Sequence, residues 1–495
     1  MKRNIIYTLL LAGLMGSFLS CNEMDLFPQD QLGPGNFWKT KTDIDMGLAG
    51  VYSKLKGGYI DWNRYWFDGL TDNGFCRHDS QSPLRNMQYG YLENTTGGPI
   101  KDVFGGCYKG IAACNNFMKN FPDAKSNAKL TDTEANSYEA EVRFLRAMFY
   151  FELVQHYKDV PLYKEAIESV ESSKIKQSKE SEVLSFIHED LDFAISNLPD
   201  AAYNTGHAVK ISAQAFKARV LLYQEDWSGV EKYAKEVISA NKCALAQDLT
   251  SIFIKKGGLT GEGQLNNSEI IFSVTYLAPD VYQESGSETQ FYSWSALTPT
   301  ENLMKIYSEN DKRFKEWYYY SGVGVREWTN PFGDVVSVTD ATFTGWMLLK
   351  HFDKYHKENY NFSDTNFRTD NDVIILRYAD VLLMYIEAMV EQEGGTTSDP
   401  DAIAYMNAIR ERAGIDKVGS SVSRDELRLE RRKELAFEGL RYFDITRWKI
   451  AEDVMNGFAP TPDGATCKFE KRFYMWPFPL SETDVNPNLD QKEGY

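Results

Sequence analysis

Glu434 and Glu438 are spaced like a pair of carboxylates that work together in acid–base chemistry. Such a pair hydrolyses a glycosidic bond when one member has a raised pKa and acts as a general acid. A separation of four residues places both on one face of a predicted helix. Their basic neighbours are Arg431, Arg432, Lys433 and Arg441. Because positive charge lowers the pKa of a carboxyl group and favours ion pairing, we predict that this pair is structural.

Other catalytic motifs are absent from the sequence. The histidines are His78, His156, His188, His207, His351 and His356, and none belongs to an HExxH zinc motif. The SxxK triplet at residues 53–56 has no KTG partner, and the glycine-rich residues 257–263 precede no basic residue that would hold a phosphate. The cysteines form no CxxC pair. We therefore expect no metal site, no redox centre and no enzymatic activity.

Charge and aromatic content narrow the class of protein. The 495 residues include 54 basic and 71 acidic side chains, which give a net charge of −17. Nucleic acid is excluded as a partner, because phosphate binding needs clustered Lys and Arg. Aromatic residues make up 14% of the chain, with 29 Tyr, 29 Phe and 10 Trp. This content argues against a disordered acidic tail.

The N-terminus has the organisation of an exported protein. A basic pair at residues 2–3 precedes an uncharged, mostly apolar run over residues 4–22. Residues 18–21, Phe-Leu-Ser-Cys, resemble a bacterial lipoprotein processing site. A single transmembrane anchor is the alternative, since about 18 apolar residues span a bilayer. Glycine and serine residues make the end of this segment less apolar, and no basic stop-transfer cluster follows it. Both observations favour the lipoprotein.

The lipoprotein interpretation divides the start of the chain into two parts. We predict that residues 1–20 are a signal peptide and that Cys21 becomes the lipidated N-terminus. Residues 21–36 are then a flexible tether, broken by proline and glycine. Glu23 and Asp25 resemble the acidic export signals of surface lipoproteins in Bacteroidetes.

Beyond the tether, helical periodicity dominates the chain. One apolar stripe comprises Val142, Leu145, Phe149, Leu153 and Tyr157, and a second comprises Leu376, Ala379, Leu383, Ile386 and Val390. Helices over 211–223 and around 230–237 suit a tetratricopeptide-type pair, and a helix around 402–409 offers a partner for the second stripe. Residues 57–106 and 257–370 lack sustained helical faces and contain short strand-like stretches such as 270–274. The predicted fold is mainly α: a helical scaffold with large irregular insertions.

Four blocks in order along the chain resemble the SusD/RagB family of outer-membrane nutrient-binding lipoproteins. The most specific, residues 429–448, reads LERRKELAFEGLRYFDITRW. The others are residues 140–162, residues 377–383 (RYADVLL), and the terminal YMWPFP of 474–479 with NPNLDQ of 486–491. The resemblance implies one SusD-like domain over residues 37–495, with an N-terminal part of about 37–245 and a C-terminal part of about 265–495.

This resemblance also implies a function. Members of the family cap a SusC-like, TonB-dependent β-barrel transporter, capture a glycan at the cell surface and pass it to the barrel. The resemblance therefore implies a surface-exposed outer-membrane protein held by a lipid on Cys21, with a glycan ligand and no catalysis. It implies no cofactor, and no residue pattern indicates the structural calcium ion that some relatives carry.

A sugar ring is held by aromatic planes against its C–H face and by hydrogen-bonding groups around its rim. The candidate aromatic platforms lie in the 257–370 insertion and are Trp294, Tyr292, Tyr282, Trp328 and Trp317. The candidate polar partners lie in the loop after Trp66, where the family often places ligand contacts, and are Asp72, Asn73, Arg77 and Asp79. Core packing is the alternative role for each aromatic, and of Trp62 and Trp66 we expect at least one to be buried.

Three other functions stay open at this point. The same fold and transporter could serve peptide uptake, because Tyr and Trp also anchor peptides. A surface glycan hydrolase is a rival from another class, opposed only by the missing catalytic site. A purely structural helical adaptor would leave the loop aromatics unexplained.

Overall fold

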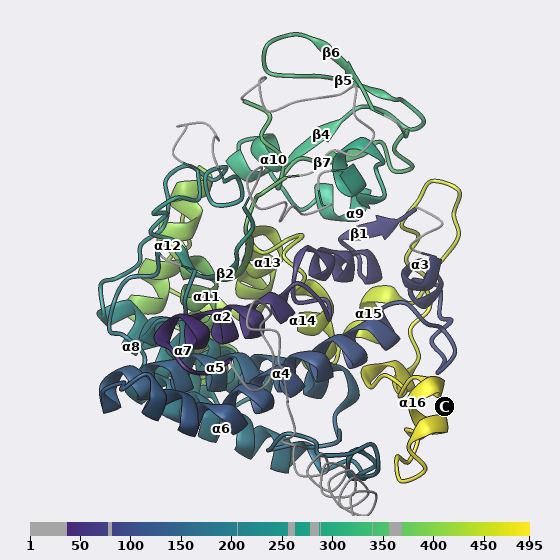
Figure 1. The fold of residues 1–495 in the computed structure, drawn as a ribbon. Helices are drawn as coiled ribbons and strands as arrows, with labels where there is room; N and C mark the ends of the chain where they lie inside the picture. The colour runs from purple at the N-terminus through teal and green to yellow at the C-terminus, as the bar shows by residue number, and fades with distance from the viewer. Residues whose placement is uncertain are drawn as a thin grey trace, which may run out of the picture.

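The structure is a computed structural model that describes residues 37–77, 82–204, 206–255, 263–277, 287, 289–338, 340–355 and 369–495. Helices dominate it, which confirms the predicted mainly-α class, and the strand pairs of residues 318–348 lie at one end of the molecule (Figure 1). The predicted signal peptide, Cys21 and the tether lie outside the described residues. Within the described ranges, no helix combines the length and the apolar character that crossing a bilayer requires.

The bounds of the elements are as follows. The longer helices are α2 (Lys41–Tyr52), α4 (Pro99–Asn127), α5 (Asp132–Tyr157), α6 (Glu180–Asn197), α7 (Lys210–Tyr223), α8 (Trp227–Ser239), α11 (Tyr378–Gln392), α12 (Pro400–Ala413) and α13 (Arg424–Glu434). The shorter ones are α3 (Ser82–Gln88), α9 (Glu301–Met304), α10 (Lys312–Trp317), α14 (Arg441–Arg447), α15 (Ala451–Met455) and α16 (Leu480–Val485). The 3-10 segments are η2 (Ser53–Leu55), η3 (Trp62–Leu70), η5 (Glu171–Ser173) and η8 (Lys471–Tyr474), and η6 (Thr289–Ser293) is a short π-helical segment.

Local sequence sets where these helices begin and end. Helix α5 starts with a capping box, in which Thr131 accepts from the backbone of Glu134 and Glu134 accepts from the backbone of Thr131. Helix α12 begins with Asp399 as its N-cap and Pro400 at its first position. It ends at Gly414, whose φ of 73° is the left-handed conformation that terminates many helices.

The two predicted helix pairs are confirmed. Helix α7 packs on α8, α11 packs on α12, and α8 also packs on α11, so the pairs lie side by side. Val230, Ala234 and Val237 form the buried face of α8, as their spacing predicts. Leu376 departs from the prediction because it lies in strand β8 (Val373–Arg377), two residues before α11 begins.

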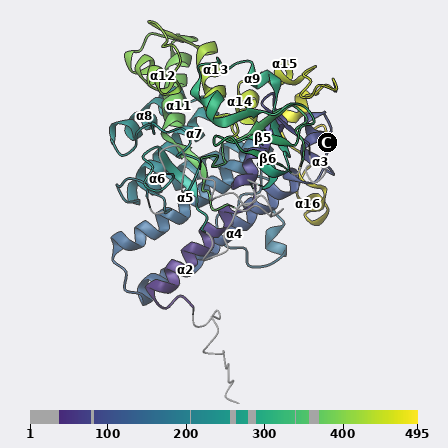
Figure 2. The same cartoon turned by 90° about the horizontal axis from the view of Figure 1, so that it is seen from above.

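Helix α4 begins at Pro99, inside the 57–106 stretch for which no sustained helix is predicted, so that boundary is wrong. Its glycines let other parts of the chain approach closely. A Cβ at Gly110 would lie 2.4 Å from ring carbons of Phe149 on α5, and one at Gly106 would lie 2.4 Å from the backbone of Gly58. Helix α2 lies alongside α4 (Figure 2), α4 packs on α5, and α5 packs on α6.

The strands form antiparallel pairs rather than one continuous sheet. The pairs are β1 (Gly74–Cys76) with β3 (Leu297–Pro299), β2 (Ile270–Val274) with β8, β4 (Tyr318–Tyr320) with β7 (Trp346–Leu348), β5 (Glu327–Thr329) with β6 (Val335–Ser337), and β9 (Thr396–Thr397) with β10 (Val422–Ser423). Strand β2 confirms the strand predicted at 270–274. The β5–β6 hairpin is inserted between β4 and β7 and projects from the scaffold (Figure 1).

A buried ionic network ties the C-terminal region to the scaffold. Glu434 accepts hydrogen bonds from Arg313, Arg377 and Arg412, and Glu438 accepts from Arg377. Burial acts to raise the pKa of both carboxyls, but the guanidinium groups outweigh it and hold each pKa below its ordinary value. The prediction of a structural, ion-paired role is confirmed. The prediction that Glu434 and Glu438 share one helix face is wrong, because Glu434 is the last residue of α13 and Glu438 lies beyond it.

Two apolar clusters stabilise the fold. The main cluster runs through the helices and includes Trp66, which is fully buried as expected for one of the Trp62–Trp66 pair. A second, smaller cluster lies under the β5–β6 hairpin. It comprises Tyr292, Trp328, Val336, Val338, Met347, Leu349 and Phe352.

Candidate functional site

Three of the predicted aromatic platforms are buried, so the expectation that they offer open ring faces is wrong. Trp317 is fully buried at the end of α10, with the Lys350 ammonium 3.9 Å from the centre of its ring system. Trp328 points inward from β5 between two exposed neighbours, as alternation along a strand requires, and donates a hydrogen bond to the hydroxyl of Tyr292. Tyr292 itself stacks on Phe352 with ring centroids 3.9 Å apart. All three fill cores instead of facing a ligand.

Two of the predicted polar partners are likewise structural. Asp72 accepts hydrogen bonds at 2.9 and 3.0 Å from Arg441 and pairs with Arg432 at 2.9 Å. Burial alone would raise the pKa of Asp72, but the two guanidinium groups lower it below its ordinary value. Asn73 is buried and bonds Asp68 and Arg432 through its side-chain amide. These side chains attach the loop after η3 to α13 and α14, so they are not available to a ligand.

Arg77 and Trp294, in contrast, lie close together. The backbone N–H of Arg77 donates to the carbonyl of Ala296, 2.9 Å away, which places Arg77 beside the turn that carries Trp294. Asp340 reaches the same turn, because its N–H donates to the carbonyl of Ser293. Trp294 is half-buried against the main core. Tyr282 and Asp79 lie outside the described residues.

Arg77 is held by the loop that precedes β7. Its guanidinium donates to the carbonyl of Ala341 at 3.2 Å and lies 3.6 Å from the Asp340 carboxylate. The same group lies over the ring of Phe343, 4.8 Å from its centroid. Phe343 remains 44% exposed, so its outer face is open to solvent beside a charged hydrogen-bond donor.

An aromatic pair continues this region across β4 and β7. Tyr320 and Trp346 are directly opposite in the antiparallel register, and their ring centroids are 4.9 Å apart. The indole N–H of Trp346 donates to the Glu301 carboxylate at 2.9 Å, and Tyr320 is 56% exposed. Gly345 makes this approach possible, since its φ is +85° and a Cβ there would lie 2.6 Å from the Tyr320 ring.

We call these residues the aromatic surface, and they come from three separate segments of the chain. Its members are Arg77, Trp294, Glu301, Tyr320, Asp340, Phe343 and Trp346. It combines open ring faces with carboxylate and guanidinium groups, which is the combination that binds a polyhydroxylated ring.

Sequence reasoning named Arg77 and Trp294 but missed Tyr320, Phe343 and Trp346. The segment Tyr318-Tyr319-Tyr320 carries three successive rings, of which the first is buried and the last exposed. The strand register would have shown which of these rings is exposed. It could not be predicted, because β4 is three residues long and its partner strand is more than twenty residues away. Nothing in the local sequence supplies that pairing.

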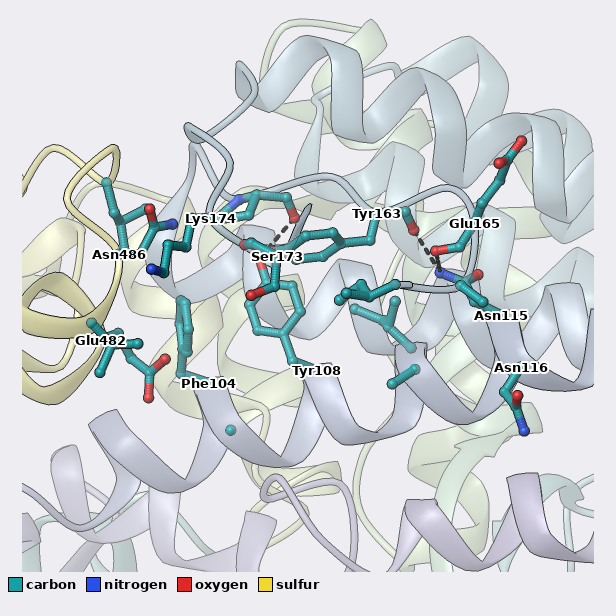
Figure 3. A pocket seen from close by; sticks show the side chains of 18 residues that line it. Phe104, Tyr108, Asn115, Asn116, Tyr163, Glu165, Ser173, Lys174, Glu482 and Asn486 are labelled. Atoms are coloured by element: carbon teal, nitrogen blue, oxygen red, sulfur yellow. Dashed lines mark hydrogen bonds between the residues drawn. The ribbon is translucent and has the colours of Figure 1, made fainter. Parts of the chain in front are cut away.

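An apolar pocket of about 410 Å³ lies at the other end of the molecule, between α4, the segment after α5, and α16 (Figure 3). Its polar groups are used within the chain. The Asn115 amide donates to the carbonyls of Tyr163 and Glu165 at 2.8 and 3.0 Å, and the Tyr108 hydroxyl donates to Pro161. Rings such as Phe104 and Tyr108 and aliphatic side chains form much of the wall, and polar side chains such as Asn116 and Glu482 also line it (Figure 3).

Two of the histidines lie in the core. His156 and His351 are buried, and burial lowers the pKa of each to about 3. Across the part of the chain that the structure describes, no group of three His, Cys, Asp or Glu side chains is placed to hold a metal ion.

Comparison with known families identifies the fold. The family model described as the SusD family matches residues 239–495, slightly more than half of the chain. The chain belongs to the SusD family. A second model, described as starch-binding associating with outer membrane, matches residues 25–222. The resemblance predicted from the four sequence blocks is therefore confirmed, and the most specific block spans α13 and α14.

Individual SusD relatives match along nearly the whole length. The SusD-like protein P2 of Formosa agariphila is 27% identical over 531 aligned positions, which cover 99% of this chain and 98% of the relative. A crystal structure of a SusD-like protein from Bacteroides fragilis superposes with a TM-score of 0.77 at 26% identity, covering 95% of this chain and all of that one. Surface glycan-binding protein A from Bacteroides thetaiotaomicron, in complex with laminarihexaose, gives a TM-score of 0.72 at 21% identity, covering 91% and 99%. That last likeness shows the shared fold.

Proposed function

We propose that this protein binds a cell-surface glycan, an oligosaccharide or polysaccharide, on the aromatic surface and delivers it to a SusC-like, TonB-dependent transporter. The observation that carries the proposal is the Tyr320–Trp346 pair beside Phe343 and Arg77. It places ring faces and charged hydrogen-bonding groups on one surface built from the 257–370 insertion and from Arg77.

The physical fit is with a sugar ring. Stacking on Trp346, Tyr320 or Phe343 would bury the apolar C–H face of the ring, and the rim hydroxyls would find donors and acceptors at Arg77 and Glu301. The SusD neighbour solved with laminarihexaose supports this class of ligand for the shared fold. Binding without bond cleavage fits the ion-paired state of the buried glutamates, because a general acid needs a raised pKa.

The membrane role is part of the same proposal. The family description places related proteins at the outer membrane. A lipid on Cys21 and the tether of residues 21–36 would hold the domain at the cell surface, next to the barrel that receives the glycan. The neighbouring genes test this role: a SusC-like transporter encoded beside this chain supports delivery.

Glycan binding is tested with the mature chain without its lipidated cysteine, residues 22–495, on a glycan array, followed by calorimetric titration of the glycans that bind. Trp346→Ala and Trp294→Ala should each weaken binding by tenfold or more, because each removes an apolar stacking face. Tyr233→Ala is the matched control, since Tyr233 is a partly buried tyrosine on α8, away from strands β4 and β7, which carry the aromatic surface (Figure 1). Its affinity should equal that of the wild type.

Three results would overturn the proposal. Unchanged affinity in both tryptophan variants would remove the aromatic surface from the binding site. Binding to a peptide library with no glycan bound would instead favour peptide uptake by the same fold. Reducing ends released from a bound polysaccharide would show that the protein is a hydrolase.

A further inference from the structure

A hollow of about 560 Å³ opens beside Trp62, separate from the aromatic surface. Helix α2, the start of η3 and the end of β2 form its walls, with residues 206 and 207 at its side. Trp62 is half-buried: it packs on Trp66 and Phe291, with centroids 6.5 and 6.0 Å away, and it also lines the hollow. An indole anchored in this way is a fixed stacking surface, because its orientation is set by the core.

A second hollow, of about 380 Å³, adjoins the first. The two share the lining residues Gly206, Ser273, Thr275 and Tyr276, so they lie next to each other on either side of these residues. We call the two hollows together the Trp62 groove. Each hollow lies within the range of volumes typical of small-molecule sites, and a ligand that fills both must contain more than one ring.

The groove is lined with hydrogen-bonding groups. Asp61 is only 4% exposed, and both hydrogen bonds that it accepts from Asn63 reach the same oxygen, Oδ1. Asp61 lines the first hollow, so its carboxylate is the acceptor that this hollow offers to a ligand hydroxyl. The side chains of Asn204 and Asn266 are exposed in the second hollow, and the hydroxyl of Thr275 lies where the two hollows meet.

The charges in the groove are balanced. The first hollow contains Lys56 and Asp61, and the Lys56 ammonium lies 4.5 Å from the centre of the Tyr276 ring. In the second hollow, Lys255 pairs with Asp372 and also donates to the carbonyl of Tyr276 at 3.0 Å. One lysine and one aspartate in each hollow give no net attraction for a polyanion. The groove therefore suits an uncharged polyhydroxylated ligand.

We infer that the Trp62 groove is a second binding site for a neutral oligosaccharide, distinct from the aromatic surface. The inference rests on the proposed function, because it assumes that glycans are what the protein meets. A polysaccharide long enough to reach both sites gains affinity through effective concentration, without any new contact. The groove thus favours polymers over short oligosaccharides.

The experiment is native affinity electrophoresis of the mature chain in gels that contain laminarin, amylopectin, xylan or mannan, with alginate and polygalacturonate as anionic comparisons. Thr275→Trp fills the junction of the two hollows from an exposed position, and Trp62→Ala removes the stacking face. Each should weaken binding to the neutral polysaccharide that retards the wild type by about tenfold. The loss should be smaller for the matching hexasaccharide if that fragment occupies the aromatic surface alone.

Thr133→Trp is the control, because Thr133 is an exposed threonine in the first turn of α5, outside both sites. It should bind like the wild type. Asp61→Asn keeps the shape and the Asn63 contacts, so it tests the groove if Trp62→Ala lowers the unfolding temperature; it should also weaken binding.

Each contrary result of the experiment contradicts a different part of the inference. Wild-type retardation that is unchanged in Thr275→Trp, Trp62→Ala and Asp61→Asn overturns the groove and leaves the aromatic surface as the site. Groove-dependent binding of alginate or polygalacturonate overturns the neutral class of ligand. A wild type retarded by none of the polysaccharides refutes the proposed function, and the groove falls with it.

Discussion

The Arg377 guanidinium donates to both carboxylate oxygens of Glu438, with Nε 2.8 Å from Oε2 and Nη2 2.7 Å from Oε1. This bidentate pair joins the last residue of β8 to the turn after α13, and both side chains are almost completely buried. A buried ion pair adds little stability over a well-packed apolar pair, but breaking it leaves an uncompensated charge. The pair therefore fixes which segments meet.

Replacing Glu438 with glutamine should lower the free energy of unfolding by about 3–5 kcal/mol, because Arg377 and Lys350 would lose their shared carboxylate. Glu168→Gln is the control, since the Lys119–Glu168 pair is exposed and should contribute less than about 1 kcal/mol. Urea unfolding followed by circular dichroism measures both. Equal effects in the two variants would contradict a special role for the buried pair.

Acid should destabilise the protein through its paired carboxyls. In the folded state the pKa of Glu434 lies well below its ordinary value of 4.5, because three arginines outweigh the effect of burial. Its contribution to stability is present above pH 4.5 and is lost as the pH falls below that value, since the unfolded chain then binds the proton. Each such carboxyl reduces the unfolding free energy by up to about 1.4 kcal/mol per pH unit.

Asp68 works in the opposite direction. Burial raises its pKa to about 6, so its contribution to stability grows as the pH falls from 6 towards 3.8. Urea titrations at intervals from pH 7 to pH 3 should show a shallow dependence above pH 4.5 and a steep loss below it. Stability that stays constant between pH 5 and pH 3 would contradict the paired state of Glu434.

Gly110→Ala should lower the free energy of unfolding by about 1–3 kcal/mol, because the new Cβ would lie 2.4 Å from the ring of Phe149. Gly50→Ala is the matched control on α2, where a Cβ meets nothing within 4 Å. That change should stabilise the protein by about 0.5–1 kcal/mol, since alanine is the better helix former. Thermal unfolding of the two variants separates packing from helix propensity.

Cys21→Ala should release the protein from the membrane fraction or leave it unprocessed, because the variant has no thiol to acylate. Membrane fractionation with a radiolabelled fatty acid measures both outcomes, and the wild type should carry the label. Retention of the variant in the membrane with an uncleaved N-terminus would favour the transmembrane anchor instead.

The sequence predicted the helical scaffold well because its signals are local. Val230, Ala234 and Val237 repeat at helical spacing, and the same residues form the buried face of α8. The ion-paired role of Glu434 also followed from neighbours in the sequence. Its partners did not, because Arg313 and Arg377 lie more than fifty residues away.

The binding residues were harder to predict because exposure depends on pairing between distant segments. Trp328 is buried by Tyr292 and Phe352, whereas Trp346 stays on the surface beside Tyr320. Both tryptophans lie in short strands of the same insertion, and their local sequences do not separate them. Asp72 shows the same limit, since Arg441, which neutralises it, lies in α14 at the other end of the chain.

Because the β5–β6 hairpin has a small apolar cluster of its own, its sequence can change independently of the sequence of the helical scaffold. The β5–β6 hairpin leaves the scaffold after β4 and returns at β7, and its inward-facing side chains Trp328 and Val336 pack within that cluster. Substitutions, insertions or deletions in the hairpin are therefore absorbed locally, without a loss of stability in the helices. Changes in the sequence of this hairpin can therefore alter the ligand preference of the protein, while the packed helices keep their sequence and the fold is preserved.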